Sequence, residues 1–343
     1  MARGIVGFLR HSARIGRQAL SVTLLLATLL IGSVAIHQNS ARTRETNEII
    51  TRLSAEVSRL SQEQSMPAVV VARHRQSICY IYALYALTPP GHGMFQHPMR
   101  TRVSGTGFVV ANGVIATNRH VIQPWFDDDE DEGLIARGYT PKVEKLMAFF
   151  PDRAKAVDLT DVQVSHTDDL AIAHFATSIE TANLRPLPLA ESPALAGDAV
   201  VVVGYPMGVT AMLAKSPRKV YKRLAYTHET IDIARDLAQN YLIRPSATYG
   251  HLGDVVEDRL IYDAPTAQGG SGGPVFNSRG QVIGVNSAYI DGFAGGTLGV
   301  SVAALKPLLA QSQSRHTRSP KLEQAAADTP SSVQQASAGE FHK

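Results

Sequence analysis

Cysteine is almost absent from this sequence, which excludes an internal disulfide bond. The only cysteine among the 343 residues is Cys79. It lies in the apolar run 78–82, a pattern typical of a buried β-strand. A chain of this length can bury a large hydrophobic core, so it can fold outside the cytoplasm without disulfide bonds.

The sequence also lacks a surplus of basic charge once its first segment is set aside. Four of the 33 lysine and arginine residues lie within residues 1–36, which contain no acidic residue. The remainder of the chain therefore has 29 basic and 30 acidic residues. The net charge of +3 therefore gives no support for nucleic-acid binding, and we expect no nucleic-acid partner. Hydrophobic residues make up 44% of the chain, which excludes global disorder.

Charged side chains are missing from residues 20–36. As a helix this run would span roughly 25 Å, near the short end for a bilayer crossing. The arginines of residues 1–19 would keep that end in the cytoplasm. We therefore expect a single-pass inner-membrane anchor, with the following domain in the periplasm or extracytoplasmic space. Residues 33–35 fit a signal-peptide cleavage site, so secretion after cleavage is the alternative.

Residues 37–66 are expected to form a helical stalk, which Pro67 ends. Within 41–65, four apolar residues follow a 3-4-3 spacing, as in the core positions of a coiled coil. They are Ile50, Leu53, Val57 and Leu60. Two heptads leave two interpretations open, a simple amphipathic stalk and a homo-oligomer formed through the stalk.

From residue 67 to about 310 the pattern predicts an all-β domain. Short β-rich runs alternate with turn residues, as in a barrel or sandwich. These runs are residues 69–72, 107–110, 113–116, 146–150, 169–175, 199–203, 259–262, 281–285 and 298–302. A proline-containing segment, 186–193, divides the region, so we expect two barrels, over about 67–185 and 194–310.

Three further segments interrupt or follow this β pattern. The six consecutive acids at 127–132 predict a solvated surface loop, since they lack the alternating ligand pattern of a calcium loop. Residues 215–244 read as a basic stretch followed by a helix over 227–242 with Thr227 as its cap. This insertion is either surface decoration or a lid beside the active site. The Ser-, Gln- and Ala-rich residues 311–343 predict a disordered tail.

The strongest chemical signal is Ser271, which lies among four glycines in the segment 268–274. A serine hydroxyl becomes a nucleophile when a base takes its proton, and the oxyanion that forms needs nearby N–H donors. A glycine-rich turn can point the N–H groups of Gly269 and Ser271 into one space. A phosphate-binding loop would instead require a lysine and a following helix, which are absent here.

Two more motifs supply partners for this serine. His120 follows a predicted hairpin over residues 105–117, and Asp169 leads directly into an apolar strand, whereas Asp168 reads as a turn residue. A buried carboxylate can fix the tautomer of a histidine that acts as the base. The chain order His, Asp, Ser is that of chymotrypsin and differs from the orders of subtilisin and the α/β-hydrolases.

These segments resemble the HtrA group of trypsin-like serine proteases, which have the chymotrypsin fold. The resemblance lies in residues 104–108, 117–121, 169–172, 203–208, 269–274 and 284–287. It implies two six-stranded antiparallel β-barrels with the active site between them, preceded here by the membrane helix and stalk and carrying a helical insertion. It also implies that Thr266, Ala267, Gln268, Asn286, Ser287 and Ala288 bind the substrate.

The chain departs from the HtrA pattern in two places. We expect no peptide-binding PDZ domain after the second barrel, and the usual asparagine before the serine is Gly270, which leaves open whether the oxyanion hole is preformed. The loop before the serine contains no acid, so cleavage after small or medium aliphatic residues is expected rather than after lysine or arginine.

Three functions are compatible with these features. The first is a serine endopeptidase that cleaves extracytoplasmic proteins, in quality control or regulation, without a metal or another cofactor. The second is a latent protease fold that serves as a binding or scaffold protein. The third is another acyl-transfer enzyme, such as an esterase.

Overall fold

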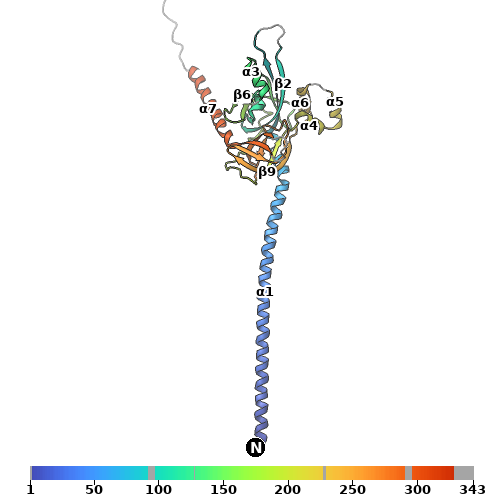
Figure 1. Cartoon of the computed structure of the whole chain (residues 1–343), viewed down its shortest axis with the longest axis vertical. Coiled ribbons are helices and arrows are strands. Elements are labelled where there is room, and N and C mark those ends of the chain that lie inside the picture. The colour runs from blue at the N-terminus through green and yellow to red at the C-terminus, as the bar shows by residue number, and fades with distance from the viewer. Residues whose placement is uncertain (1, 92–96, 127, 227–228, 290–295, 328–343) are drawn as a thin grey trace, which may run out of the picture. The chain divides into compact units, whose positions relative to one another are not determined.

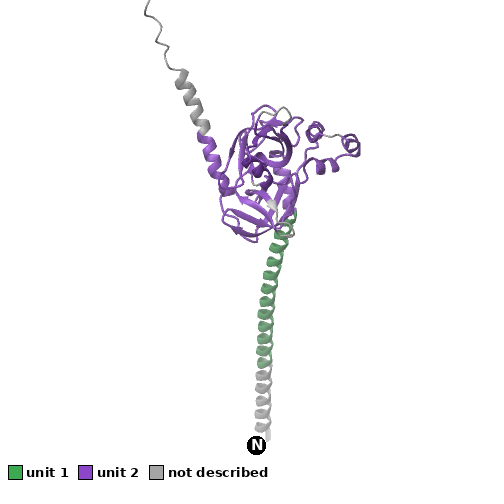
Figure 2. Cartoon of the chain, turned by 45° about the horizontal axis from the view of Figure 1, so that its top comes forward, with its two compact units in different colours: residues 1–64 green, residues 65–343 purple. Residues whose placement is uncertain are grey.

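A computed structural model of the chain describes residues 2–91, 97–126, 128–226, 229–289 and 296–327. The chain separates into two compact units, Met1–Gln64 and Ser65–Lys343, which Figure 2 shows in different colours. All strands of the described part lie in the second unit. The candidate catalytic residues therefore belong to a single compact unit.

Helix α1 covers Ala2–His74 and includes the helix predicted over residues 41–65. The predictions near its end were wrong, because Pro67 lies inside the helix and residues 69–72 are helical rather than a strand. Met66 and Val70 are only 5% and 3% exposed. Their packing in the core of the second unit outweighs the β-propensity of the valines and the helix-breaking effect of proline. The stalk helix thus continues beyond residue 66.

The described part of the chain contains one helix, within Val22–Ser77, that is long and apolar enough to cross a membrane. Its apolar window has a mean hydropathy of 1.5, and none of that window is buried. Length and composition alone support a span here, and a signal sequence has the same properties.

The first barrel is a seven-stranded antiparallel sheet in the order β5-β4-β1-β2-β3-β7-β6. Figure 1 labels two of its strands, β2 and β6. Its strands are β1 (Ile78–Thr88), β2 (Met99–Ala111), β3 (Val114–Thr117), β4 (Thr140–Phe149), β5 (Val157–Asp158), β6 (Thr160–Val164) and β7 (Ala171–His174). Only Leu159 separates β5 from β6, although these strands lie at opposite edges of the sheet. This bent segment joins the two edges, and counted as one strand it gives the six strands predicted.

The second barrel is closed and has the predicted six strands, in the order β10-β13-β12-β11-β8-β9. They are β8 (Ala199–Gly204), β9 (Ser246–Val256), β10 (Arg259–Tyr262), β11 (Pro274–Phe276), β12 (Val282–Tyr289) and β13 (Thr297–Ser301). The chymotrypsin-like arrangement of two antiparallel barrels is therefore confirmed.

Buried aromatic residues pack the two barrels against each other. The rings of Tyr80 on β1 and Tyr205 after β8 lie 5.8 Å apart, edge to face. The Tyr205 hydroxyl donates a hydrogen bond to the Ile78 carbonyl (3.0 Å), and the Tyr80 hydroxyl is bonded to that of Ser104 (2.8 Å). Each buried hydroxyl thus has a polar partner, which burial in an apolar core requires.

Short helices connect and decorate the barrels, and a longer one, α7, follows the last strand. They are the 3-10 turn η1 (Arg75–Ser77) and the helices α2 (Arg119–Ile122), α3 (Asp129–Ala136), α4 (Gly208–Ala214), α5 (Arg218–Leu224), α6 (Thr230–Gln239) and α7 (Val302–Ala327). The helical insertion predicted over 215–244 is present as α5 and α6, and α4 precedes it. The predicted cap Thr227 lies outside the described residues, and α6 begins at Thr230 instead.

Two segments predicted to be irregular are helical. Most of the acidic segment 127–132 belongs to α3, while Asp127 lies outside the described residues. Asp128 caps α3 by accepting bonds from the amides of Glu130 and Asp131, and acids in a first helical turn stabilise the helix dipole. The C-terminal tail is helical as far as Ala327, and its remaining residues, 328–343, lie outside the described part.

Candidate active site

The glycine-rich turn that carries Ser271 fits against the first barrel. The Thr106 amide on β2 donates to the Ser271 carbonyl (2.8 Å). Gly272 has φ +85°, and a Cβ atom there would lie 2.0 Å from the Thr106 carbonyl oxygen and 2.2 Å from Thr117 Oγ1. Only glycine allows both this backbone conformation and this close approach. The turn therefore fixes Ser271 at the junction of the two barrels.

His120 lies on the short helix α2, where the carboxylate of Asp169 holds it twice. The His120 amide donates to Asp169 Oδ1 (3.0 Å), and His120 Nδ1 lies 2.8 Å from Asp169 Oδ2. The Asn118 side chain donates to the Asp169 carbonyl (2.7 Å), which fixes the backbone of the aspartate as well. Asp168 faces away and accepts bonds from Ser165 and Thr167. The structure thus brings Asp169, and not Asp168, to the histidine.

Ser287 connects the aspartate to the serine. Its hydroxyl donates to Asp169 Oδ2 (2.6 Å), and its carbonyl accepts a hydrogen bond from Ser271 Oγ (2.8 Å). The sequence placed Ser287 among the substrate-binding residues but did not reveal the bond to Asp169. The two side chains are 118 residues apart in sequence, and the motif around Ser287 carries no local pattern that pairs it with an aspartate.

The pKa of Asp169 is below its ordinary value. Burial of the carboxyl opposes ionisation, but the hydrogen bonds from His120 and Ser287 and the charge interaction with His120 outweigh it. The carboxylate therefore stays ionised next to the imidazole and can stabilise an imidazolium.

The loop before Ser271 is tied down at several points. The Gly269 carbonyl accepts a bond from Thr106 Oγ1 (2.8 Å), and the Met207 amide donates to the Gln268 carbonyl (2.7 Å). Within the described residues, the amides of Gly269 and Ser271 donate to no backbone carbonyl. These two N–H groups are the donors that the sequence assigned to the oxyanion hole.

The structure gives a physical reason for Gly270, where the HtrA pattern has asparagine. A Cβ atom at Gly270 would lie 2.5 Å from Thr266 Oγ1 and 3.0 Å from the Ala267 carbonyl oxygen. The Gly270 amide also donates to that carbonyl (2.8 Å). Thr266 thus occupies the space a side chain would need, and the loop is tightly packed at this position.

One predicted substrate-binding residue is in the wrong place for that role. The Asn286 side chain is completely buried, accepts a bond from the Tyr262 hydroxyl (2.7 Å) and donates to Thr266 Oγ1 (3.1 Å). It cannot contact a substrate without breaking these bonds. Gln268 is exposed and Ala267 half-buried. The side chain of Ala288 lies outside the described residues.

Two antiparallel barrels, with His120 and Asp169 on one and Ser271 on a glycine-rich turn of the other, define the class of chymotrypsin-like folds. The chain belongs to the trypsin-like peptidase domain family, whose sequence model matches residues 105–285. The matched segment contains all three residues.

Known proteins similar to this chain include bacterial serine endoproteases. It is 30% identical to a "Probable periplasmic serine endoprotease DegP-like" of Chlamydia trachomatis, across 62% of this chain and 34% of that protein. It is 27% identical to the Pseudomonas fluorescens protein of the same name, across 81% and 50%. The chain therefore spans half or less of the length of these relatives. The resemblance to HtrA-type proteases is confirmed.

A solved structure of a serine endoprotease from Yersinia pestis is 17% identical to this chain. The match covers 71% of this chain and 64% of that one, with a TM-score of 0.44.

Proposed function

We propose that this protein is a serine endopeptidase in which Ser271 is the nucleophile, His120 the general base and Asp169 the residue that orients His120. The observation that carries the proposal is the pair of hydrogen bonds from His120 to the Asp169 carboxylate, at 2.8 and 3.0 Å. Ser287 links the same carboxylate to Ser271 on its glycine-rich turn. The carboxylate holds the proton on Nδ1, which leaves Nε2 free to accept one from the serine.

The proposed reaction begins with a rotation of the Ser271 side chain. Its hydroxyl now donates to the Ser287 carbonyl, so it must turn toward His120 Nε2 before it can attack. The same rotation frees the Ser287 carbonyl, which can then accept a hydrogen bond from a backbone N–H of the substrate. Binding of an extended peptide and activation of Ser271 are therefore coupled in this proposal.

After rotation, Ser271 Oγ attacks the scissile carbonyl carbon while His120 Nε2 takes its proton. The N–H groups of Gly269 and Ser271 bind the developing oxyanion. His120 then donates the proton to the leaving amine, and a water molecule hydrolyses the acyl-enzyme by the same steps in reverse. Every proton transfer passes through His120, so no metal or other cofactor is required.

We expect the substrates to be proteins cleaved after small or medium aliphatic residues. The loop 264–268, which precedes the oxyanion residues, contains no acid to pair with lysine or arginine. Of the residues proposed to line the pocket, Thr266, Ala267 and Ser287 are small and neutral. A peptide-library profile dominated by lysine or arginine would refute this preference.

We further propose a single-pass anchor at residues 20–36, with residues 1–19 in the cytoplasm and the protease domain in the periplasm. The apolar helix and the periplasmic relatives support this location. The domain would begin near Ser65, where the second compact unit starts. Retention of the full-length chain in alkali-washed membranes is the expected result, and release of a shorter chain would indicate signal cleavage.

The stalk is a candidate for self-association. Ile50, Leu53, Val57 and Leu60 are between 45% and 64% exposed along the coiled-coil spacing. Copies anchored in one membrane would have parallel stalks. Pairing of two stalks would bury these four side chains between the helices.

A latent scaffold is the second candidate, because the Ser271 hydroxyl is bonded to Ser287 rather than to His120. The two candidates are separated by exposing the full-length chain, in detergent, to a fluorescent fluorophosphonate beside its Ser271→Ala variant. We expect labelling that disappears in the variant. A folded parent chain that stays unlabelled would favour the scaffold.

A further inference from the structure

The bent segment β5–β6 closes the first barrel only in part, because it pairs with the end of β4 and leaves the rest of that strand's outer edge uncovered in the part of the chain that the structure describes. Strand β4 pairs with β1, with a register irregularity at Glu144. On its other side it pairs with β5 at Met147 and Ala148, and the Leu146 carbonyl accepts a hydrogen bond from the Leu159 amide (2.9 Å). Strand β6 pairs with β7. Within the described residues, no strand covers the outer edge of β4 over residues 140–145. The N–H and C=O groups along such an edge can pair with another extended chain.

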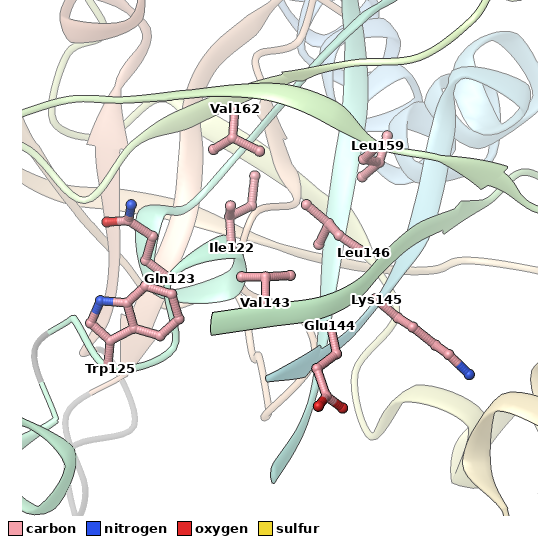
Figure 3. Close-up of a pocket in the computed structure, with 9 residues that line it drawn as sticks. All are labelled: Ile122, Gln123, Trp125, Val143, Glu144, Lys145, Leu146, Leu159 and Val162. Carbon is pink, nitrogen blue, oxygen red and sulfur yellow. The ribbon is translucent and has the colours of Figure 1, made fainter. Parts of the chain in front are cut away.

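A cavity of about 350 Å³ lies at this opening, and Figure 3 shows its lining. The lining residues come from α2 and the segment after it, from β4, and from the bent strand: Ile122, Gln123, Trp125, Val143, Glu144, Lys145, Leu146, Leu159 and Val162. The cavity floor is apolar and buried, whereas Val162 is 37% exposed at the rim. This volume is at the small end for ligand sites, so it suits one or two apolar side chains.

The cavity is close in sequence and structure to the catalytic histidine. Ile122 is the last residue of α2, the helix that carries His120. The neighbouring Arg119 side chain donates to Gln123 Oε1 (3.0 Å) and to the Ser165 carbonyl (3.2 Å), and its guanidinium lies 3.9 Å from the centre of the Phe126 ring. These contacts hold the segment that forms the cavity wall against the loop that carries the aspartate.

An open strand edge beside an apolar cavity is the arrangement that recognises an extended polypeptide. Backbone hydrogen bonds to the edge supply affinity, and a pocket for alternate side chains supplies specificity. A small apolar molecule would fill the cavity but leave the edge groups of β4 unpaired. The two features together therefore favour a peptide.

We propose that this opening, residues 140–145 of β4 with the cavity beside it, is an exosite for protein substrates. An extended segment of the substrate, away from the scissile bond, adds as a strand to β4 and places an apolar side chain between Val143 and Val162. The inference rests on the proposed endopeptidase function, which supplies unfolded polypeptide as the ligand.

Binding is tested separately from cleavage, with the full-length Ser271→Ala chain in lipid nanodiscs. The probe is a fluorescein-labelled octapeptide in which leucine alternates with serine, and its binding is followed by anisotropy. Trp125 is the only tryptophan in the chain, so its emission reports occupancy of the cavity directly. Adding Val162→Glu should raise the Kd at least tenfold, and Val162→Thr should raise it less.

Val256→Glu is the matched control, because Val256 is a β-strand valine, 47% exposed on β9, that does not line the cavity. It should leave the Kd unchanged. A peptide with alternate backbone amides methylated keeps its side chains but cannot pair with β4, and should bind at least tenfold more weakly. Equal binding by the Val162→Glu and Val256→Glu chains, or by both peptides, would overturn the proposal. Trp125 quenching that rises with protein concentration in the absence of peptide would also overturn the proposal, because such quenching would mean that a second copy of the chain occupies the cavity.

Cleavage then connects the exosite to function. In the chain with Ser271 intact, Val162→Glu should lower kcat/KM at least tenfold for an unfolded protein and leave hydrolysis of a short tetrapeptide substrate unchanged. The unchanged tetrapeptide rate also shows that the variant is folded. Equal loss on both substrates would contradict an exosite. If the parent chain cleaves neither substrate, the proposed function fails, while the binding result still stands or falls on its own.

Discussion

Asp169→Asn is the change that most directly tests the proposed triad. In the structure, Asp169 Oδ2 accepts two hydrogen bonds, from His120 Nδ1 (2.8 Å) and from the Ser287 hydroxyl (2.6 Å), and Oδ1 accepts a third from the His120 amide (3.0 Å). An asparagine has one acceptor oxygen and one NH₂ group. If the oxygen stays at Oδ1, two donors face the NH₂ group. If it turns to Oδ2, the His120 amide loses its acceptor.

The expected loss follows from these bonds. A hydrogen bond to a charged group contributes about 1.5–3 kcal/mol, so disruption of two of them costs about 3–6 kcal/mol. The substitution also favours the wrong histidine tautomer, with the proton on Nε2. In the chymotrypsin template the equivalent change lowers kcat about 10⁴-fold, which corresponds to about 5.4 kcal/mol. We therefore expect the second-order rate constant for fluorophosphonate labelling to fall by about three to four orders of magnitude.

Asp168→Asn is the matched control for this experiment. It removes the adjacent carboxylate, which accepts bonds from Ser165 and Thr167 but not from His120. Its labelling rate should stay within about threefold of the parent, since the Asp168 side chain makes no hydrogen bond to His120, Ser271 or Ser287 and asparagine keeps an acceptor for Ser165 or Thr167. A rate within tenfold of the parent for Asp169→Asn would refute the assigned role. Equal losses in both variants would mean that the loop, rather than the carboxylate at Asp169, was responsible.

Four further outcomes follow from the structure. Ser287→Ala removes one charged hydrogen bond from Asp169 and should slow labelling about 10- to 100-fold; an unchanged rate would contradict its positioning role. The pKa of Asp169 is lowered on folding, so the ionised carboxylate stabilises the folded state. This stabilisation is complete above the unfolded pKa of about 3.9 and is lost as the pH falls through the lower folded pKa. Urea midpoints measured between pH 2 and 6 should therefore show a weaker acid dependence for Asp169→Asn than for the parent, and parallel curves would exclude this contribution. Gly272→Ala would force a Cβ atom against the Thr106 carbonyl and should abolish labelling and lower the Tm, as calorimetry would show; near-normal labelling would mean that the turn is not held as the structure has it. If the stalk self-associates, Leu53→Asp should shift the detergent-solubilised chain to a smaller species in sedimentation velocity, and an identical species would rule out pairing through this seam.

The parts of the site that sequence predicted are those carried by local motifs. The glycine turn around Ser271 and the strand entered at Asp169 are encoded by neighbouring residues, so each can be recognised without knowledge of the fold. Asn286 belongs to an equally recognisable segment, yet its side chain points into the second barrel and bonds Tyr262 and Thr266. Register within a strand decides which alternate residues face the cleft, and a one-residue shift reverses the answer.

The end of α1 shows a different limit, where tertiary packing overrode local preference. Residues 69–72 are three valines and an alanine and read as a strand. The helix continues through them because Val70 is buried in the core, and His74 stacks on Phe276 of β11 with ring centres 5.2 Å apart. A partner 202 residues away in sequence decides this helix end, and propensity carries no information about it.

Thr106 explains why the site forms at the junction of the barrels. The sequence identified it only as part of a β-strand motif. Its amide donates to the Ser271 carbonyl, its hydroxyl donates to the Gly269 carbonyl and accepts from the Tyr205 amide, and its own carbonyl accepts from Thr117. This one buried residue of the first barrel therefore contacts both sides of the turn that carries Ser271 and the segment after β8. Since Thr117 lies three residues before His120, the same network connects the serine turn to the helix that carries the histidine. The relative position of the two proposed catalytic groups thus depends on bonds between barrels, which neither barrel's sequence encodes alone.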